Sequence, residues 1–350
     1  MIFLIIVSIY CLLIIALAFG FARLEEIAGD GAFSNSISVI VAVRDEDKLN
    51  NLLDDLSKIQ YPKERWELIV VDDHSAMPPA CQYISNKGIG KKAAITTGIA
   101  SAKGDIIVTT DGDCRVDPRW LAAINSAFQK PGVKMVVGGV RIEEDRTFFS
   151  KLQALEFVSV SVTGAATIGL GFPTMSNGAN LSFRKDAFYE VGGYQGNENI
   201  PSGDDEFLMN KFDPNSIIFL NSKSSVVSTT ASRSIDEFVQ QRLRWAGKWK
   251  TNTSLATKLF AVAIFLFHVS FVVITIGALM GSELFRWLLM AKVFVEAILL
   301  IPAASFFGTR WRWIPFFVLQ LVYPVYVISI GLLSQVVLPK WKGRAVEAKV

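Results

Sequence analysis

The chain has 350 residues, of which 51% are hydrophobic and 19% are charged, and its formal net charge at pH 7 is +3. This apolar excess is too large for an average soluble protein, so apolar residues are expected to concentrate in particular segments. The small, scattered positive charge argues against a nucleic-acid surface. Three cysteines without C-x-x-C spacing and two histidines argue against a disulfide framework, a zinc site and a histidine-based catalytic triad.

The first 22 residues contain no charged residue. As a helix, a segment of this length crosses about 30 Å of hydrocarbon. It lacks the positive amino-terminal region of a signal peptide, and its apolar part is long for one. We therefore predict a transmembrane anchor at 1–22.

Residues 36–233 show an alternation of strand-like and helix-like patterns that is typical of a soluble α/β domain. A β-branched run at 36–43 is followed by leucines at helical spacing, and a second run at 66–71 ends in an acidic turn. A helical pattern at 91–102 leads to a third run at 104–110 and a second acidic turn. We predict a largely parallel sheet with a ligand site beyond the carboxyl ends of its strands, where both turns fall.

After residue 142 the pattern is less regular. We predict a helix at 147–163, followed by a Gly- and Asn-rich segment at 172–183. Ser234 and Glu237 form a capping-box signature that opens a helix at 234–256. Because this helix carries tryptophans and basic residues, it is typical of a membrane interface.

Three further apolar segments lie at 259–281, 287–307 and 313–338. They form a predicted membrane region at 257–338, which is followed by a basic tail at 339–350. In the middle segment, Lys292 and Glu296 are spaced to form an ion pair that faces a helix bundle. If the soluble domain is cytoplasmic, three crossings place the basic tail outside, against the positive-inside tendency. A re-entrant or interfacial segment is the alternative, and Pro324 points to the last one.

The two acidic turns carry the first candidate site residues. Asp111 and Asp113 present hard oxygen atoms one residue apart after a strand, an arrangement suited to a divalent cation bound to a diphosphate. Asp72 and Asp73 would accept hydrogen bonds from a base or from ribose hydroxyls. Singly, each pair is better explained as an ordinary turn or cap. Their shared position after strands favours a nucleotide site.

A run of three carboxylates follows at Asp204, Asp205 and Glu206. Mutual repulsion makes at least one of several confined carboxylates more basic, which prepares a general base. A solvated acidic loop is the competing interpretation.

The predicted interfacial helix carries a third group of candidates. Gln241, Arg244 and Trp245 share one helical face or its edge and offer an amide, a guanidinium and an aromatic ring. Arg244 suits a diphosphate, and Trp245 suits a sugar face. The alternative is a helix whose basic side chains extend to the membrane surface, as Arg242 and Lys248 are expected to do.

The ordered set of these motifs resembles the family 2 glycosyltransferases, which include hyaluronan, chitin and cellulose synthases and ceramide glucosyltransferase. DDHS and DGDC, each after a strand, then SGDDE and QQRLRW occur in the family's order within residues 36–250. The resemblance implies a GT-A fold, a nucleotide-diphosphate sugar donor, expected to be UDP-linked, a divalent metal (Mg²⁺ or Mn²⁺) and inversion at the sugar C1. It also implies transfer to a lipid, lipid-linked glycan or polysaccharide acceptor at the cytoplasmic face of the plasma (inner) membrane.

On the donor side, the resemblance assigns nucleotide-sugar binding to Asp72, Asp73, Lys91, Lys92, Asp111 and Asp113. Within that set, Asp72 and Asp73 are expected to bind the nucleoside, and Asp111 and Asp113 are expected to bind the metal. The lysine near the donor is Lys91 or Lys92.

On the acceptor side, Asp205 matches the family's general base best, and a one-residue shift would give that role to Asp204. Gln241, Arg244 and Trp245 match the Q-x-x-R-W motif, which lies near the acceptor and the diphosphate. Arg244 is expected to assist the leaving group. The Gly- and Asn-rich segment is expected to shape the acceptor side.

Two rival classes stay open at this point. A nucleotide-sugar-binding membrane protein without catalysis would be expected to lack a metal ligand, the base or Arg244, and none is missing. A transporter or scaffold would need polar residues in several membrane segments, and only His268 and the pair Lys292 and Glu296 suggest that. Donor sugar, acceptor, and processive or single transfer are not decided by the sequence.

Overall fold

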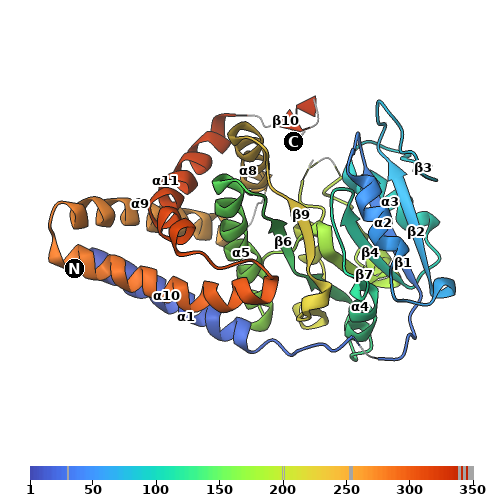
Figure 1. Ribbon diagram of the computed structural model, residues 1–350, viewed down its shortest axis with the longest axis horizontal. Helices are drawn as coiled ribbons and strands as arrows, with labels where there is room; N and C mark the ends of the chain where they lie inside the picture. The colour runs from blue at the N-terminus through green and yellow to red at the C-terminus, as the bar shows by residue number, and fades with distance from the viewer. Residues whose placement is uncertain are drawn as a thin grey trace. The chain divides into compact units, whose positions relative to one another are not determined.

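The computed structural model describes residues 1–29, 31–198, 200, 202–251, 255–337, 340–341 and 344–345. The contacts within the chain divide it into two compact units (Figure 1). The sheet unit comprises Gly20–Glu143 and Val160–Thr230, and the helix unit comprises Met1–Phe19, Glu144–Ser159 and Ala231–Val350. Residues 144–159, which the sequence places inside the soluble domain, thus group with the apolar helices.

The sheet unit is built around a seven-stranded sheet with the order β3-β2-β1-β4-β7-β5-β8. Its strands are β1 (Ile37–Val43), β2 (Trp66–Asp72), β3 (Ile84–Ser85), β4 (Ile106–Asp111), β5 (Met135–Gly138), β7 (Leu181–Arg184) and β8 (Ile217–Leu220). The first four are parallel, whereas β7 is antiparallel to both β4 and β5. The predicted α/β sheet is therefore confirmed, with an antiparallel strand inserted where the sequence pattern became irregular.

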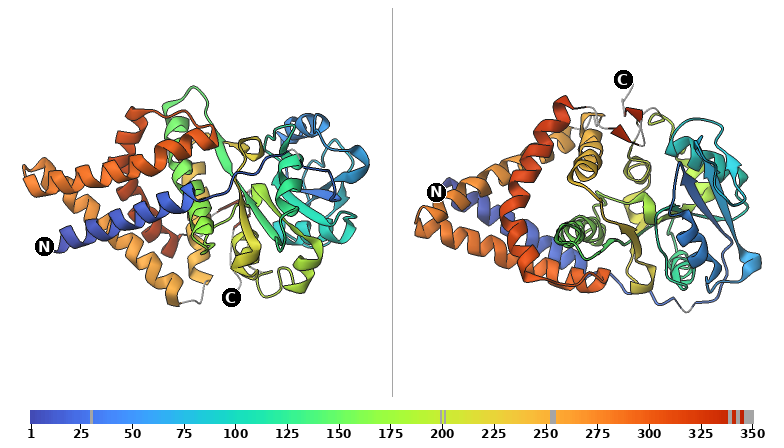
Figure 2. Two further views of the ribbon diagram at one scale, coloured as in Figure 1. Left: turned by 90° about the horizontal axis from the view of Figure 1, so that it is seen from below. Right: turned by 45° about the horizontal axis from the view of Figure 1, so that its top comes forward.

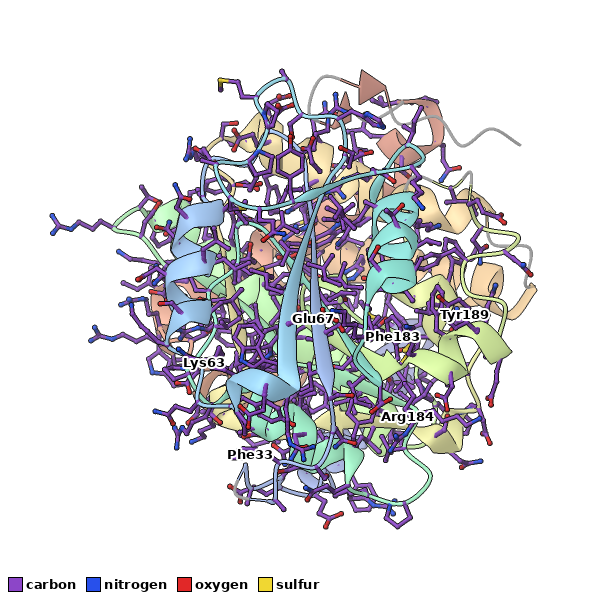
Figure 3. The ribbon with its side chains drawn as sticks, turned by 90° about the vertical axis from the view of Figure 1, so that its right-hand side faces the viewer. Phe33, Lys63, Glu67, Phe183, Arg184 and Tyr189 are labelled. Carbon is purple, nitrogen blue, oxygen red and sulfur yellow. The ribbon has the colours of Figure 1, made fainter. Side chains whose placement is uncertain are left out.

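The carboxyl ends of β1, β2 and β4 lie level at one edge of this sheet. Val43 is opposite Asp72, and Ala42 is opposite Asp111. β1 is buried almost throughout, as expected for an apolar strand covered on both faces. Figure 3 looks onto this unit, with Glu67 on β2 and Phe183 on β7 labelled. The two acidic turns therefore leave the sheet at neighbouring points.

Helices and short turns connect these strands. They are α2 (Leu49–Ser57), α3 (Lys91–Ser101), α4 (Trp120–Phe128), α6 (Lys185–Glu190), α7 (Glu206–Met209) and the 3-10 turns η1 (Lys63–Arg65), η2 (Gly178–Asn180), η3 (Pro214–Ser216) and η4 (Lys223–Ser225). A second, two-stranded parallel sheet joins β6 (Val140–Glu143) and β9 (Val227–Thr230). A bridge between Arg115 and Ser228 brings β9 beside the loop that follows β4.

The helix unit contains the apolar segments. Its helices are α1 (Ile2–Ala22), α5 (Phe148–Gly169), α8 (Ile235–Thr251), α9 (Leu255–Leu279), α10 (Glu283–Phe307) and α11 (Trp313–Val336), and the unit boundary falls within α1 and α5. Five described helices are long and apolar enough to cross a membrane, namely α1, α5, α9, α10 and α11. The sequence predicted four. The addition is α5, and 61% of its most apolar window is buried inside the protein.

Helix α1 packs into this unit through one face. Its Val7 joins a core cluster with Phe271, Ile274 and Leu288, and the ring centroids of Phe3 and Phe285 are 5.3 Å apart. The views in Figures 1 and 2 show α1 running alongside α10. The predicted anchor is thus also a member of a helix bundle.

A buried polar cluster lies inside this bundle. The ammonium of Lys292 is 2.8 Å from a carboxylate oxygen of Glu296 and 2.6 Å from the amide oxygen of Gln320. The Tyr10 hydroxyl of α1 donates to Glu296. The sequence prediction of an i,i+4 pair facing a bundle is confirmed. Pro324 lies inside α11, which continues past it.

The predicted start of the interfacial helix is confirmed in part. Helix α8 begins at Ile235, and the Ser234 hydroxyl accepts a hydrogen bond from the Glu237 backbone N–H at 3.1 Å. The Glu237 carboxylate accepts from the Arg233 backbone N–H, one residue before the position expected in a capping box. In the predicted tail, β10 (Lys340–Trp341) pairs with β11 (Arg344–Ala345), and the other tail residues are outside the described residues.

Candidate active site

A lysine and two carboxylates from three distant segments meet beyond the carboxyl end of β4. The ammonium of Lys91, the first residue of α3, lies 2.6 Å from a carboxylate oxygen of Asp111 and 3.2 Å from one of Asp204. The lysine side chain is 25% exposed and the Asp204 side chain 14% exposed. The sequence named all three residues, but only the fold brings them together.

The charge state of Lys91 follows from these neighbours. Burial by itself lowers the pKa of Lys91, but the carboxylates of Asp111 and Asp204 outweigh burial and hold the pKa well above its usual value. The lysine is therefore protonated. One positive charge faces Asp111 and Asp204, with Asp205 also within electrostatic reach, so negative charge prevails around it.

Asp113 lies two residues after Asp111 and shares its surroundings. One of its oxygens accepts a hydrogen bond from the Thr229 hydroxyl of β9 at 2.9 Å. Burial and the neighbouring Asp111 carboxylate raise the pKa of Asp113, against the opposing effect of Thr229. Gly112 stands between them, where a Cβ would come within 2.9 Å of the Glu46 side chain. This close approach requires glycine in the D-G-D turn.

These two carboxylates fit a divalent cation shared with a diphosphate. Mg²⁺ is usually held by one or two protein carboxylates, with phosphate oxygens and water completing its six ligands. Among the described residues, no group of three or more His, Cys, Asp and Glu side chains is arranged to hold a metal ion. The described part of the chain therefore contains no metal site made only of protein ligands. Asp111 and Asp113 are instead suited to a cation that a bound diphosphate would also hold.

The acidic run at Asp204 and Asp205 is held by the Gly- and Asn-rich segment. Asp205 caps α7, because one of its oxygens accepts from the Glu206 backbone N–H at 2.7 Å. Its other oxygen accepts from the Gly178 backbone N–H at 3.1 Å. A Cβ on Gly178 would lie 2.7 Å from an Asp204 oxygen and 3.1 Å from the Lys91 ammonium. The solvated-loop interpretation therefore does not describe these two carboxylates.

Sequence reasoning missed Gly178 as a site residue. Its backbone N–H holds Asp205, its carbonyl accepts from the Thr109 hydroxyl of β4 at 2.9 Å, and its missing side chain leaves room for Asp204. The Gly- and Asn-rich composition of residues 172–183 points to the segment as a whole, and it does not single out Gly178.

Asp72 and Asp73 are buried and tie the first acidic turn together. Asp72 accepts a hydrogen bond from the Ser75 backbone N–H at 3.3 Å. Asp73 accepts from the Asn86 amide at 2.7 Å and from the Gly90 backbone N–H at 2.9 Å. The capping interpretation of these aspartates is thus observed, and nucleoside binding stays a prediction.

The two candidate lysines are separated by the fold. Lys92 is 7% exposed and donates to the carbonyls of Asn197 and Ile200 at 2.7 and 2.9 Å. Its ammonium also lies over the Phe207 ring, 5.1 Å from the centroid. Lys91 thus joins the carboxylates described above, and Lys92 is directed to backbone carbonyls.

The residues of the Q-x-x-R-W motif lie on α8 in the helix unit. The Gln241 amide oxygen accepts from Arg242 at 2.5 Å, and the Trp245 ring centroid lies 4.3 Å from the Arg242 guanidinium. The side chain of Arg244 is partly buried. Arg242 itself does not extend to a membrane surface as expected, because it is 4% exposed and paired with Glu156. Lys248 falls outside the described side chains.

The sheet, its acidic edge and the apolar helices define an α/β protein with a GT-A fold and candidate membrane spans. A family profile described as "Glycosyl transferase family group 2" matches residues 106–334, which is more than half of the chain. The chain belongs to this family.

Two curated relatives show how far the similarity reaches. The chain is 29% identical over 147 residues to the dodecaprenyl-phosphate galacturonate synthase of Rhizobium johnstonii, covering 37% of this chain and 43% of that protein. It is 25% identical over 258 residues to the glycosyltransferase AglE of Haloferax volcanii, covering 66% and 79%. The chain thus spans less than half the length of the first relative.

A solved structure shares the fold. The mannosyltransferase PcManGT from Pyrobaculum calidifontis, in complex with GDP-Man and Mn²⁺, superposes with a TM-score of 0.55 at 15% identity. The match covers 95% of this chain and 96% of that one.

Proposed function

We propose that this glycosyltransferase moves a hexosyl group from a UDP-linked sugar to a lipid-linked acceptor at the cytoplasmic face of the plasma (inner) membrane, with inversion at C1. The observation that carries the proposal is the group of Lys91, Asp111 and Asp204 beside Asp113, where negative charge prevails and is only partly buried. The apolar helices and the dodecaprenyl-phosphate in the name of the first relative support a lipid-linked acceptor.

On the donor side, Asp111 and Asp113 would hold Mg²⁺ or Mn²⁺, and a cation bound there supplies positive charge beside the diphosphate. The Mn²⁺ in the PcManGT complex supports this assignment. Lys91 adds a second positive charge on the same side. Asp72 and Asp73 bind the nucleoside.

On the acceptor side, Asp205 accepts the proton of an acceptor hydroxyl as the hydroxyl oxygen bonds to C1. The bond from C1 to the diphosphate oxygen breaks, and the diphosphate leaves with the electron pair. One step of this kind inverts the configuration at C1, as in inverting glycoside chemistry. For Gln241, Arg244 and Trp245, a role at the acceptor and the leaving group rests on the Q-x-x-R-W motif.

A phosphate acceptor is the second candidate, favoured by the name of the first relative. A phosphate oxygen is already ionised near pH 7 and needs no base to attack C1. Replacement of Asp205 therefore separates the two acceptors: a hydroxyl acceptor loses transfer, and a phosphate acceptor keeps most of it.

The test is transfer by the purified full-length protein in detergent, with a panel of nucleotide sugars and with Mg²⁺ or Mn²⁺. One arm contains a polyprenyl phosphate, and the other contains a membrane-lipid extract. Mass spectrometry sizes the products, and NMR of the anomeric proton gives the configuration at C1. Binding of a nucleotide sugar without transfer in either arm would contradict the proposal and support a catalytically silent binding protein.

A further inference from the structure

A second buried ion pair lies within the helix unit, between α5 and α8. The side chains of Glu156 and Arg242 are 5% and 4% exposed. Arg242 donates to both carboxylate oxygens of Glu156, with nitrogen–oxygen distances of 2.5 and 3.3 Å. The two charges balance, so this pair has no surplus charge with which to attract a ligand.

Arg242 connects this pair to the Q-x-x-R-W motif. Its third nitrogen donates to the amide oxygen of Gln241 at 2.5 Å. Its guanidinium lies over the rings of Phe238 and Trp245, 4.5 and 4.3 Å from their centroids. Because the amide oxygen of Gln241 faces Arg242, the amide nitrogen faces the opposite way. The guanidinium thus sets the orientation of two of the three motif side chains.

Helix α5 presents one face to α8 and to the residues just before it. The Gln153 side chain exchanges two hydrogen bonds with the backbone of Ser232, at 2.9 and 3.0 Å. Phe157 packs on Trp245 with centroids 6.0 Å apart. Gln153, Glu156 and Phe157 follow the i, i+3, i+4 spacing of one helical face. This face explains why a helix apolar enough to cross a membrane contains a carboxylate.

A purely structural role does not require these charges. Replacing a buried ion pair by apolar residues of similar volume is often neutral or stabilising, whereas removal of one partner is strongly destabilising. What an apolar pair does not supply is the fork of N–H donors that holds Glu156 and Gln241 together.

We propose that Glu156 and Arg242 are positioning residues for glycosyl transfer, which hold the Gln241 amide and the Trp245 ring of the Q-x-x-R-W motif in their orientations. This inference rests on the proposed function. Neither residue touches the substrate, and both act through Gln241 and Trp245.

The test begins with Glu156→Gln and Arg242→Lys in the full-length protein. Each variant is expected to lower kcat at least about tenfold and to leave the KM for the nucleotide sugar nearly unchanged, because each one disturbs the hydrogen-bonded fork. Lysine keeps the charge but lacks the fork. The matched control is Asp236→Asn, an exposed carboxylate on the same helix, which should keep wild-type kcat.

A double-mutant cycle shows whether Glu156 acts through Gln241. In a Gln241→Ala protein, adding Glu156→Gln should lower kcat by a smaller factor than it does in the wild-type protein, because the oriented amide is already gone and only the effect through Trp245 is left. Effects that multiply in the double variant would overturn the inference.

A variant without either charge addresses folding. The Glu156→Leu, Arg242→Met double variant is expected to have a higher melting temperature than Glu156→Gln, close to that of the wild type. Its kcat is expected to stay well below the wild-type value. Recovery of both kcat and the melting temperature would show that the ion pair has only a structural role, and it would contradict the inference. If wild-type protein transfers no sugar, the proposed function fails; if wild-type and Glu156→Gln proteins transfer equally, only this inference fails.

Discussion

The two units differ in how they arrange their buried charges. In the sheet unit, Lys91 faces Asp111 and Asp204, and the Asp111 side chain is 38% exposed. In the helix unit, Lys292 pairs with Glu296 and Arg242 with Glu156, and each pair is balanced and nearly closed to solvent. Surplus charge on partly exposed side chains is suited to a ligand of opposite charge, whereas a buried, balanced pair is suited to orienting its neighbours. We therefore expect changes in the sheet unit to act on chemistry and donor binding, and Glu296 to act on stability.

The largest effect on transfer is expected for Asp205→Asn. Loss of a general base typically costs a factor of about 10² to 10⁴ in kcat. Asparagine is also a good N-cap residue, so α7 should keep its start and nucleotide binding should persist. Steady-state kinetics with a hydroxyl acceptor provide the measurement. If Asp204→Asn shows this loss and Asp205→Asn does not, the base is Asp204.

Removal of the metal is expected to come next. Polarisation by a cation contributes several kcal/mol to such transition states, which corresponds to roughly 10² to 10³ in rate. Chelation with EDTA should lower transfer by this factor, and Mg²⁺ or Mn²⁺ should restore it in wild-type protein but not in Asp113→Asn. An Asp54→Asn protein, altered at an exposed ion pair, serves as the control. Full activity in EDTA would contradict the metal assignment.

A smaller effect on transfer is expected for Lys91→Gln. Hydrogen bonds to charged groups contribute about 1.5–3 kcal/mol, so affinity for the nucleotide sugar should fall roughly 10- to 100-fold. Titration calorimetry with the donor measures this. The neighbouring Lys92→Gln protein is the matched control, because Lys92 is directed to backbone carbonyls and should affect stability instead. Equal losses of donor affinity in both variants would mean that the fold does not separate the two lysines as described.

The smallest effect on transfer is expected for Glu296→Gln. This change leaves Lys292 buried without a carboxylate, and breaking such a pair costs about 3–5 kcal/mol of stability. The melting temperature in detergent should fall clearly, while the folded protein keeps kcat close to wild type. Glu283→Gln, at an exposed position on the same helix, should change neither quantity. A loss of kcat without a loss of stability would assign Glu296 to the reaction and contradict its role in stability.

The sequence by itself determined the elements that depend on local pattern. β1, β2 and β4 form where β-branched runs predict them, and the acidic turns follow their ends. Helices α9, α10 and α11 form where apolar length predicts them. These predictions succeed because strand alternation, turn residues and the length of an apolar segment are all properties of residues that are contiguous in the sequence.

Only the tertiary structure decided which of these residues meet. The antiparallel β7 and the turn with Gly178 come from a segment without a clear period, so their place against β4 depends on distant contacts. Lys91 and Lys92 are equivalent in sequence, and one residue of helical rotation directs one to Asp111 and the other to Asn197. The sequence predicts that Arg242 lies at the surface, but in the structure it pairs with Glu156, which is 86 positions away. Local pattern specifies the elements, whereas charge pairing across the fold specifies the roles of their side chains.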